Sequence, residues 1–149
     1  MTDGTLALRL GEPDDLRALL ALLGQMHLEI GIGTLDPEKS RAQVAYVLDK
    51  GVVLIVERDG EMIGTMGLEA AEWWYSRDKY LGDWWTYVAR EHRASGAGKL
   101  LIDTALGIAA KSEIPPLFSA LGGEDLDRKR AFYRRAGLKE IGATFIRET

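Results

Sequence analysis

A glycine-rich segment in the middle of the chain joins an apolar strand candidate to a helix candidate. It reads Val88-Ala89-Arg90-Glu91-His92-Arg93-Ala94-Ser95-Gly96-Ala97-Gly98-Lys99. Glycine lets the backbone adopt positive φ and approach a ligand closely. The first N–H groups of a helix have no acceptor within the helix, and the helix dipole gives them partial positive charge. The segment therefore predicts a phosphate-binding turn, with Arg93 and Lys99 adding charge.

Apolar periodicity on both sides of this segment predicts one domain, residues 1–149, of alternating strands and helices. The expected strands are Leu6–Leu10, Val52–Glu57, Met62–Leu68, Trp84–Ala89, Leu117–Leu121 and Leu138–Arg147. The expected helices are one starting at Pro13 and ending at Gly31, Pro37–Lys50 with Asp36 as N-cap, Lys99–Lys111, and Asp125–Ala136 with Gly137 as C-cap. The Asp59-Gly60 pair predicts a hairpin. The aromatic-rich residues 69–83 are expected to be irregular.

The predicted order is β-α-α-β-β-β-α-β-α-β. Hairpin and crossover connections occur in the same chain, so we expect an α/β fold in which helices cover a mixed sheet.

Composition excludes several classes of protein. The chain has no cysteine and only two histidines, so thiolate metal sites, a cysteine nucleophile and a three-histidine zinc site are excluded, and no metal is expected. A net charge of −4 argues against a nucleic-acid partner. No apolar run has the length of a membrane span, and no signal peptide is evident, so we expect a cytoplasmic protein without a membrane partner.

Other phosphate loops fit the glycine segment poorly. A Walker loop needs a glycine where Arg93 stands and a Ser or Thr where Leu100 stands. A dinucleotide loop needs three glycines after the first strand of a parallel sheet, whereas this segment has two and follows hairpin-like elements. A magnesium-dependent nucleotide-binding domain is therefore a lesser alternative, and the pattern that fits is Arg-x-x-Gly-x-Gly with Val88 five residues before Arg93.

This pattern resembles the pyrophosphate loop of the GNAT superfamily of acyl-CoA-dependent N-acyltransferases. The element order is also similar, and Ala131-Phe132-Tyr133-Arg134-Arg135-Ala136-Gly137-Leu138 resembles the family's Phe/Leu-Tyr-x-x-x-Gly-Phe signature. The chain departs from the family at Leu126 and Lys129, where Asn and Ala are common. The Asn often contacts the pantetheine arm, a contact that the resemblance does not carry over to Leu126.

The resemblance implies an N-acetyltransferase that moves an acetyl group from acetyl-CoA to a primary amine by direct attack in a ternary complex. Main-chain groups of the glycine segment would hold the pyrophosphate, and the strand edge would pair with the pantetheine arm. The residues implied for coenzyme A are Tyr87, Val88, Ala89, Arg93, Ala94, Ser95, Gly96, Ala97, Gly98, Lys99 and Tyr133.

The catalytic roles that the resemblance implies fall on three residues. Tyr133 would protonate the leaving thiolate, and the Val88 N–H would stabilise negative charge on the carbonyl oxygen. An alkyl ammonium titrates about three units above neutrality, so a base is needed. Asp83 stands near the expected place for this carboxylate, with Glu69 and Glu72 as rivals, and Asp83 is equally well read as a turn or cap residue.

Aromatic side chains cluster between residues 73 and 87. They are expected to fill the core, or some of them could line an acceptor pocket that stacks on an amine. The candidates for acceptor binding are Glu69, Trp73, Trp74 and Trp85. The acceptor could be a small molecule or an amine of a protein.

A second function from another class stays open, namely a CoA-binding sensor or interaction domain of the same fold without turnover. We also expect a homodimer, because members of the family often pair through their C-terminal strands.

Overall fold

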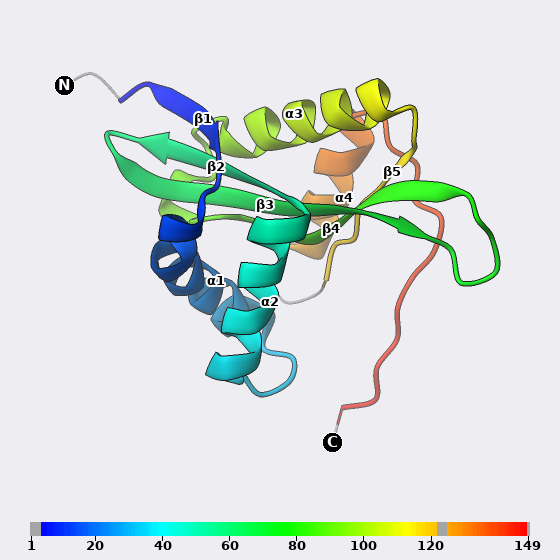
Figure 1. Cartoon of the computed structure of the whole chain (residues 1–149), viewed down its shortest axis with the longest axis horizontal. Coiled ribbons are helices and arrows are strands. Elements are labelled where there is room, and N and C mark those ends of the chain that lie inside the picture. The colour runs from blue at the N-terminus through cyan, green and yellow to red at the C-terminus, as the bar shows by residue number, and fades with distance from the viewer. Residues whose placement is uncertain (1–3, 122–124, 149) are drawn as a thin grey trace.

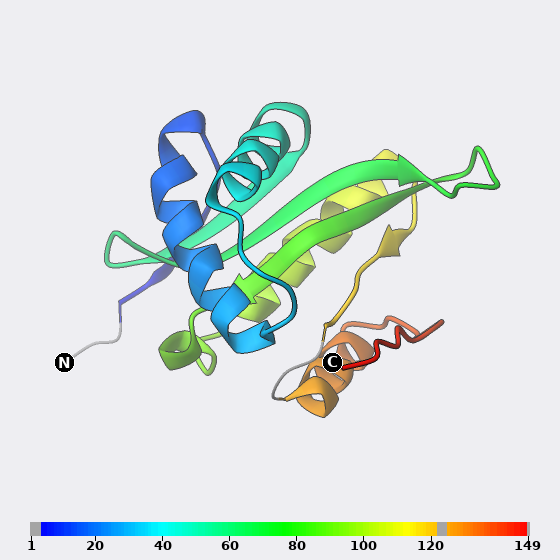
Figure 2. The same cartoon turned by 90° about the horizontal axis from the view of Figure 1, so that it is seen from below.

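The computed structural model describes residues 4–121 and 125–148 and shows a five-stranded sheet between two pairs of helices (Figures 1 and 2). The strands are β1 (Leu6–Leu10), β2 (Val52–Arg58), β3 (Glu61–Glu72), β4 (Lys79–Val88) and β5 (Pro116–Leu117), in that spatial order. The helices are α1 (Leu16–Ile30), α2 (Pro37–Lys50), α3 (Ala97–Ser112) and α4 (Leu126–Arg135). Two 3₁₀ turns complete the order, η1 (Pro13–Asp15) and η2 (Arg90–His92).

Strand pairing makes the sheet mixed, as expected. β1 to β4 are antiparallel, and β5 runs parallel to β4. The Asp59-Gly60 turn joins β2 to β3, and both residues have the positive φ that this short turn needs.

Helix ends agree with the expected caps. The Asp36 carboxylate accepts a hydrogen bond from the Lys39 N–H at 3.1 Å at the start of α2. Gly31 ends α1 with φ 68°, and Gly137 follows α4 with φ 90°.

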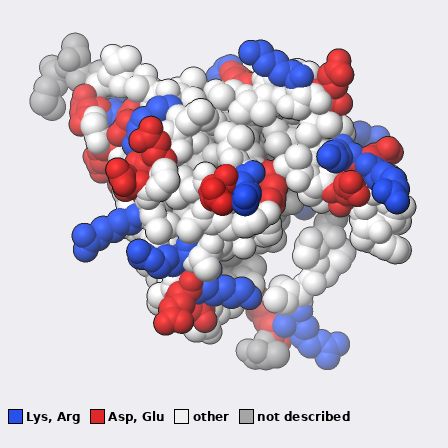
Figure 3. Space-filling view, in the orientation of Figure 1, with Lys and Arg blue, Asp and Glu red and all other residues white. Residues whose placement is uncertain are grey.

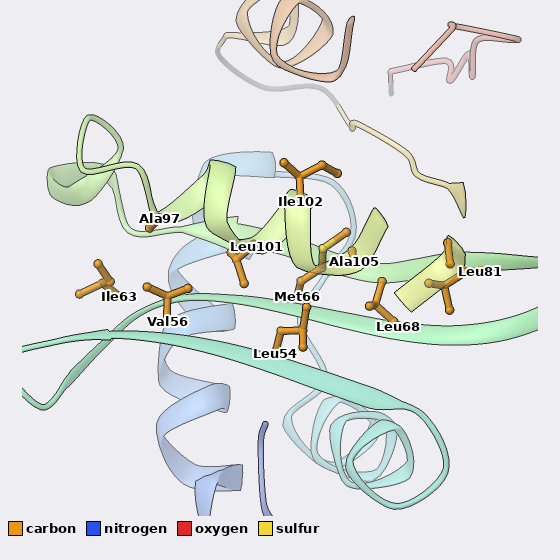
Figure 4. Close-up of a cluster of buried hydrophobic side chains, with 11 residues drawn as sticks. Leu54, Val56, Ile63, Met66, Leu68, Leu81, Ala97, Leu101, Ile102 and Ala105 are labelled. Carbon is orange, nitrogen blue, oxygen red and sulfur yellow. The ribbon is translucent and has the colours of Figure 1, made fainter. Parts of the chain in front are cut away.

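Each face of the sheet has its own apolar core. α3 and α4 cover one face, where Leu54, Met66 and Leu68 of the sheet meet Leu101 and Ala105 of α3 (Figure 4). α1 and α2 cover the other face (Figures 1 and 2). There Leu19 and Val47 pack on Val53, Ile55 and Trp85. The fold therefore places side chains of alternate strand residues on opposite faces, which decides what each residue of β4 can reach.

The hairpin of β3 and β4 is longer than expected and extends beyond the helices (Figure 1). Residues 69–83, expected to be irregular, include the ends of both strands, with Glu72 opposite Lys79 and Ala71 opposite Tyr80. Cross-strand pairs of opposite charge, and aromatic pairs such as Trp73 with Tyr80, stabilise such arms. The prediction missed them because pairing, rather than local alternation, keeps this segment extended.

The C-terminal end differs from the prediction in two elements. β5 spans only Pro116–Leu117 instead of Leu117–Leu121, and the described residues 138–148 form neither helix nor strand, so the strand expected at Leu138–Arg147 is absent. A strand of two residues exposes very few backbone N–H and C=O groups with which a further strand could pair. The short β5 therefore explains why residues 138–148 form no regular strand pairing.

Candidate functional site

β4 and β5 pair at one end only and then diverge, and this divergence opens the candidate site. The two registered pairs are Leu81 with Pro116 and Gly82 with Leu117, and the Leu81 N–H also donates to the Pro115 carbonyl at 2.8 Å. Beyond Gly82 the strands separate, and α4 lies below the opening (Figure 2). A cavity of about 350 Å³ fills this region. It is lined by Met26, Glu29, Ile30, Asp83, Trp84, Trp85, Thr86, Tyr87, Val88, Arg93, Gly98, Ser119, Ala120, Leu121, Asp125, Arg128, Lys129, Phe132, Tyr133 and Arg135.

A β-bulge at Trp84 changes which side chains of β4 face the cavity. Gly67 pairs with Trp85 while Leu68 pairs with Asp83, so Trp84 is the extra residue without a partner in β3. The bulge lets the Asp83 side chain reach the segment after β5.

The free edge of β4 presents backbone groups to the cavity. The Ala89 N–H donates to the Ile63 carbonyl of β3 at 2.8 Å. Because hydrogen bonding alternates along an antiparallel pair, the backbone groups of Tyr87 also bond to β3, whereas the N–H and C=O groups of Thr86 and Val88 point away from β3. The Ala89 N–H is thus unavailable for the predicted pairing with a pantetheine arm. The outward-pointing backbone groups are those of Val88 and of Thr86, a residue that was not predicted to contact the coenzyme.

The glycine segment forms a turn that leads into α3. Gly96 has φ 91° at the N-cap, a conformation that glycine adopts without strain. The Leu100 N–H donates to the Gly96 carbonyl at 3.0 Å, so the amides before it belong to the unpaired first turn. The Ala97 N–H donates to Ser95 Oγ at 3.2 Å, which leaves Gly98 and Lys99 to present amides to an anion. This arrangement fits a diphosphate.

Side chains of the same segment mostly serve the fold. Ala89 and Ala97 are buried, and the Ser95 hydroxyl donates to the His92 carbonyl. The Lys99 ammonium pairs with Asp103 at 2.6 Å on the exposed side of α3. Of the residues predicted for coenzyme binding, five line the cavity, namely Tyr87, Val88, Arg93, Gly98 and Tyr133. The other six do not, namely Ala89, Ala94, Ser95, Gly96, Ala97 and Lys99.

Arg93 is held in place by two neighbours. Its Nε donates to the Val88 carbonyl at 3.1 Å, and its Nη2 lies 2.6 Å from Glu29 Oε1. The Glu29 carboxylate also accepts hydrogen bonds from the Tyr87 hydroxyl and from Arg90, at 3.4 Å. Burial opposes ionisation of Glu29, but the hydrogen bonds from Tyr87 and Arg93 outweigh it and lower its pKa. Burial and the Glu29 carboxylate together raise the pKa of Tyr87 to about 12.

No motif of the sequence marks Glu29 as a residue of the coenzyme site. One signal could have found it: an acidic residue in the last turn of a helix is unfavourable against the helix dipole, so its presence at the end of α1 indicates a cationic partner elsewhere.

Asp83 and Tyr133 face each other across the opening. The Asp83 carboxylate accepts hydrogen bonds from the Thr86 hydroxyl at 2.8 Å and from the Ser119 N–H at 3.1 Å, so it bridges the diverging strands. Burial raises the pKa of Asp83, and these hydrogen bonds oppose the rise. Burial and then the charge of Asp83 raise the pKa of Tyr133 far above its usual value, against a hydrogen bond with Thr86. Tyr133 is therefore a protonated phenol at neutral pH.

Lys129 adds a cation to the α4 side of the cavity. It is partly buried, and its Nζ donates to the Leu121 carbonyl at 3.1 Å. Burial and then the positive charge of Arg93 lower its pKa.

The predicted acceptor residues lie in three different places in the structure. Trp85 packs in the core with its Nε1 donating to Thr65 at 3.1 Å. Trp73 and Trp74 lie near the end of the long hairpin, and neither lines the cavity. There the Trp73 ring stacks on Tyr75 and packs at a tilt against Tyr80. Glu69 lies just outside the cavity and accepts a hydrogen bond from Trp84 Nε1 at 3.1 Å.

Within residues 4–121 and 125–148, no group of three or more His, Asp or Glu side chains could hold a metal ion. No helix in those ranges is long and apolar enough to cross a bilayer. On the face seen in Figure 3, acidic and basic side chains are interspersed.

Comparison with known proteins supports what this geometry indicates. The model of the family described as "Acetyltransferase (GNAT) domain" matches residues 49–140, which is more than half of the 149 residues. The chain belongs to the GNAT acetyltransferase family. Members of this family use acetyl-CoA. None of the curated proteins matches the chain in sequence.

Solved GNAT structures share the fold at low sequence identity. A predicted acetyltransferase with acetyl-CoA from Clostridium acetobutylicum has a TM-score of 0.78 at 14% identity, covering 97% of this chain and 96% of that one. A GCN5-related N-acetyltransferase from Ralstonia eutropha JMP134 has a TM-score of 0.74 at 20% identity, covering 97% and 99%. A possible acetyltransferase from Clostridium difficile 630 has a TM-score of 0.75 at 17% identity, covering 97% of both. The α/β fold class predicted from the sequence is thereby confirmed.

Proposed function

We propose that the protein is an N-acetyltransferase that transfers the acetyl group of acetyl-CoA to a primary amine. The observation that carries the proposal is the cavity between β4 and α4. It brings together the free edge of β4, the Gly98 end of the α3 turn, the Asp83 carboxylate and the Tyr133 phenol. Acetyl-CoA supplies the activated acyl group as a thioester.

Binding would use main-chain groups first. The amides of Gly98 and Lys99 at the start of α3 would hold the diphosphate, and the exposed edge of β4 would pair with the amide groups of the pantetheine arm. Arg93 and Lys129 line the same cavity and supply positive charge. The bulge at Trp84 ends this free edge on the side of Asp83.

Chemistry would use three groups of the chain. Asp83, whose pKa is raised by burial, takes a proton from the attacking ammonium. The Thr86 N–H, beside Asp83 and Tyr133, donates to the carbonyl oxygen as negative charge develops on it. The Val88 N–H lies about 7 Å further along the strand and is left to pair with the pantetheine arm. The Tyr133 Oη gives its proton to the departing sulfur. The chain contains no cysteine that could carry the acyl group, in accord with direct attack by the amine.

The direct test is release of the free CoA thiol when acetyl-CoA and a panel of primary amines are supplied. We expect thiol release that depends on the amine and on the protein, together with a thermal shift by acetyl-CoA alone. A shift without thiol release from any amine, protein amines included, would contradict the transferase and favour a CoA-binding domain without turnover.

A further inference from the structure

A second carboxylate lies beside the cavity on the face of the sheet covered by α1 and α2. Glu69 of β3 accepts a hydrogen bond at Oε2 from the Tyr46 hydroxyl of α2 and another at Oε1 from Trp84 Nε1 of β4, at 3.1 Å. Three elements thus fix one carboxylate. Both donors are neutral, so they orient the carboxylate without cancelling its charge.

Charge balance distinguishes Glu69 from the other carboxylate on this side. Glu29 is paired with Arg93 at 2.6 Å and with Arg90 at 3.4 Å. Among the described residues, no Lys, Arg or His nitrogen lies within ion-pair distance of Glu69. The hydrogen bond to Glu69 raises the pKa of Tyr46, and the negative charge of Glu69 adds to the rise. An oriented carboxylate without a cation is a receptor for one.

The two donors also supply aromatic surface. Tyr46 is 44% exposed and Trp84 is 51% exposed, which is high for large aromatic side chains. Indole and phenol rings attract an ammonium group through their quadrupole, and the attraction adds to that of a nearby carboxylate. The chemistry of this cluster is therefore that of an ammonium site.

Trp84 connects the cluster to the reacting centre. It is the bulge residue of β4, it lines the cavity, and it holds Glu69. Glu69 pairs across the strands with Gly82, four residues from Thr86, which places the cluster on the order of 10 Å along β4 from the Thr86 amide proposed to bind the carbonyl oxygen.

We propose that Glu69, Tyr46 and Trp84 bind a second ammonium group of the acceptor, so that the acceptor is a diamine or polyamine. This inference rests on the proposed transferase function and names its substrate class. One ammonium group would rest on Glu69 while the other loses its proton at the cavity and attacks the thioester.

The test compares a series of α,ω-diaminoalkanes with n-alkylamines of the same carbon count. We expect kcat/KM, measured by thiol release, to be at least about tenfold higher for the longer diamines than for the matching monoamines. In Glu69→Gln this preference should vanish, because the amide keeps the shape and accepts the same hydrogen bonds but carries no charge. Activity with the matching monoamines should fall much less than activity with the diamines, and an equal fall for both would overturn the inference.

Glu72→Gln is the matched control, since it removes the same charge from the same strand on the opposite face, beside Lys79. This variant should keep the diamine preference. Equal preference in Glu69→Gln and the unmodified protein, or no preference for diamines at all, would overturn the inference.

Binding of the same diamines to the CoA-loaded protein, measured by calorimetry, decides the question without turnover. A Kd that rises at least about tenfold in Glu69→Gln, but not in Glu72→Gln, would support the ammonium site even if no amine were acetylated. Absence of thiol release would in that case count against the transferase alone. An unchanged Kd would count against the ammonium site.

Discussion

Tyr133 holds its proton because burial and the neighbouring Asp83 carboxylate both raise its pKa. The phenol is thus protonated at neutral pH, as a proton donor must be, while the raised pKa also makes it a weaker acid. We expect Tyr133→Phe to lower kcat by about 10- to 1000-fold, while the Kd for acetyl-CoA changes little. The ring still packs against Phe118 and Phe132, so the fold should persist. Steady-state kinetics and calorimetry measure the two quantities.

Tyr80→Phe is the control for this prediction, since Tyr80 packs on Trp73 in the hairpin and lies outside the cavity. Its kcat should equal that of the unmodified protein. If Tyr133→Phe also kept full kcat, the phenol would have no part in protonating the thiolate.

Asp83 should make stability depend on pH. Burial raises its pKa in the folded state above the unfolded value, so the folded protein holds that proton more tightly. The contribution to stability is present below the unfolded pKa and is lost as pH rises through the folded pKa. We expect Asp83→Asn to gain stability relative to the unmodified protein as pH rises from about 4 upward. Urea unfolding at a series of pH values measures this.

Asp14→Asn provides the comparison, because Asp14 is an exposed aspartate in η1, far along the chain from the cavity. It should follow the pH dependence of the unmodified protein. A constant difference between Asp83→Asn and the unmodified protein at every pH would show that the buried carboxyl does not titrate abnormally.

Individual site residues differed in how far the sequence could predict them. Val88, Gly98 and Tyr133 stand in motifs that resemble those of the family, and all three line the cavity. Glu29 meets Arg93 across 64 positions of the chain, and Thr86 owes its role to the ladder register. Such contacts are decided by tertiary packing, which no local pattern contains.

At the scale of elements, the turn into α3 depends on a backbone conformation. Gly96 has φ 91°, which a residue with a Cβ adopts at a cost of about 1–2 kcal/mol. We expect Gly96→Val to shift the turn and to abolish the rise in Tm that acetyl-CoA causes, because the amides after it would no longer converge on the diphosphate. Thermal unfolding with and without acetyl-CoA checks this.

Gly107→Val is the matched substitution within α3, where an added Cβ meets nothing within 4 Å. This variant should keep the full acetyl-CoA shift. A full shift in Gly96→Val as well would mean that the diphosphate is held elsewhere.

Element boundaries were predicted best where caps mark them and worst where pairing decides them. Asp36 and Gly31 mark ends of α2 and α1 in the sequence and in the structure. The arms of the long hairpin and the loss of a strand after α4 follow from which strands find partners. Pairing depends on which strands meet in the folded sheet, so local propensity could not identify it.

At the scale of the whole molecule, the cavity lies between two parts that share few backbone contacts. α4 reaches the sheet through Phe132 and Tyr133, whereas β1 to β4 form a continuous ladder. We expect acetyl-CoA to slow amide exchange in α4 and in the turn into α3, with little effect on β1 and β2. At 100 times the Kd, the added stability should be about 2.7 kcal/mol.

Hydrogen exchange followed by mass spectrometry measures the pattern, with free adenosine as a ligand that lacks both diphosphate and thioester. Uniform slowing over all strands would indicate that the ligand stabilises the molecule globally rather than bridging α4 and β4.

Among the described residues, two registered pairs join β4 to β5, at Leu81 and Gly82, and the two strands diverge from this point. A small rotation of β5 about these two pairs moves the far end of the strand much more than the pairs themselves. Residues such as Pro115, whose carbonyl accepts the Leu81 N–H, can therefore change the width of the opening between the strands. We therefore expect substitutions at Pro115 and its neighbours to change the affinity for acetyl-CoA, although no residue proposed to contact the coenzyme is changed.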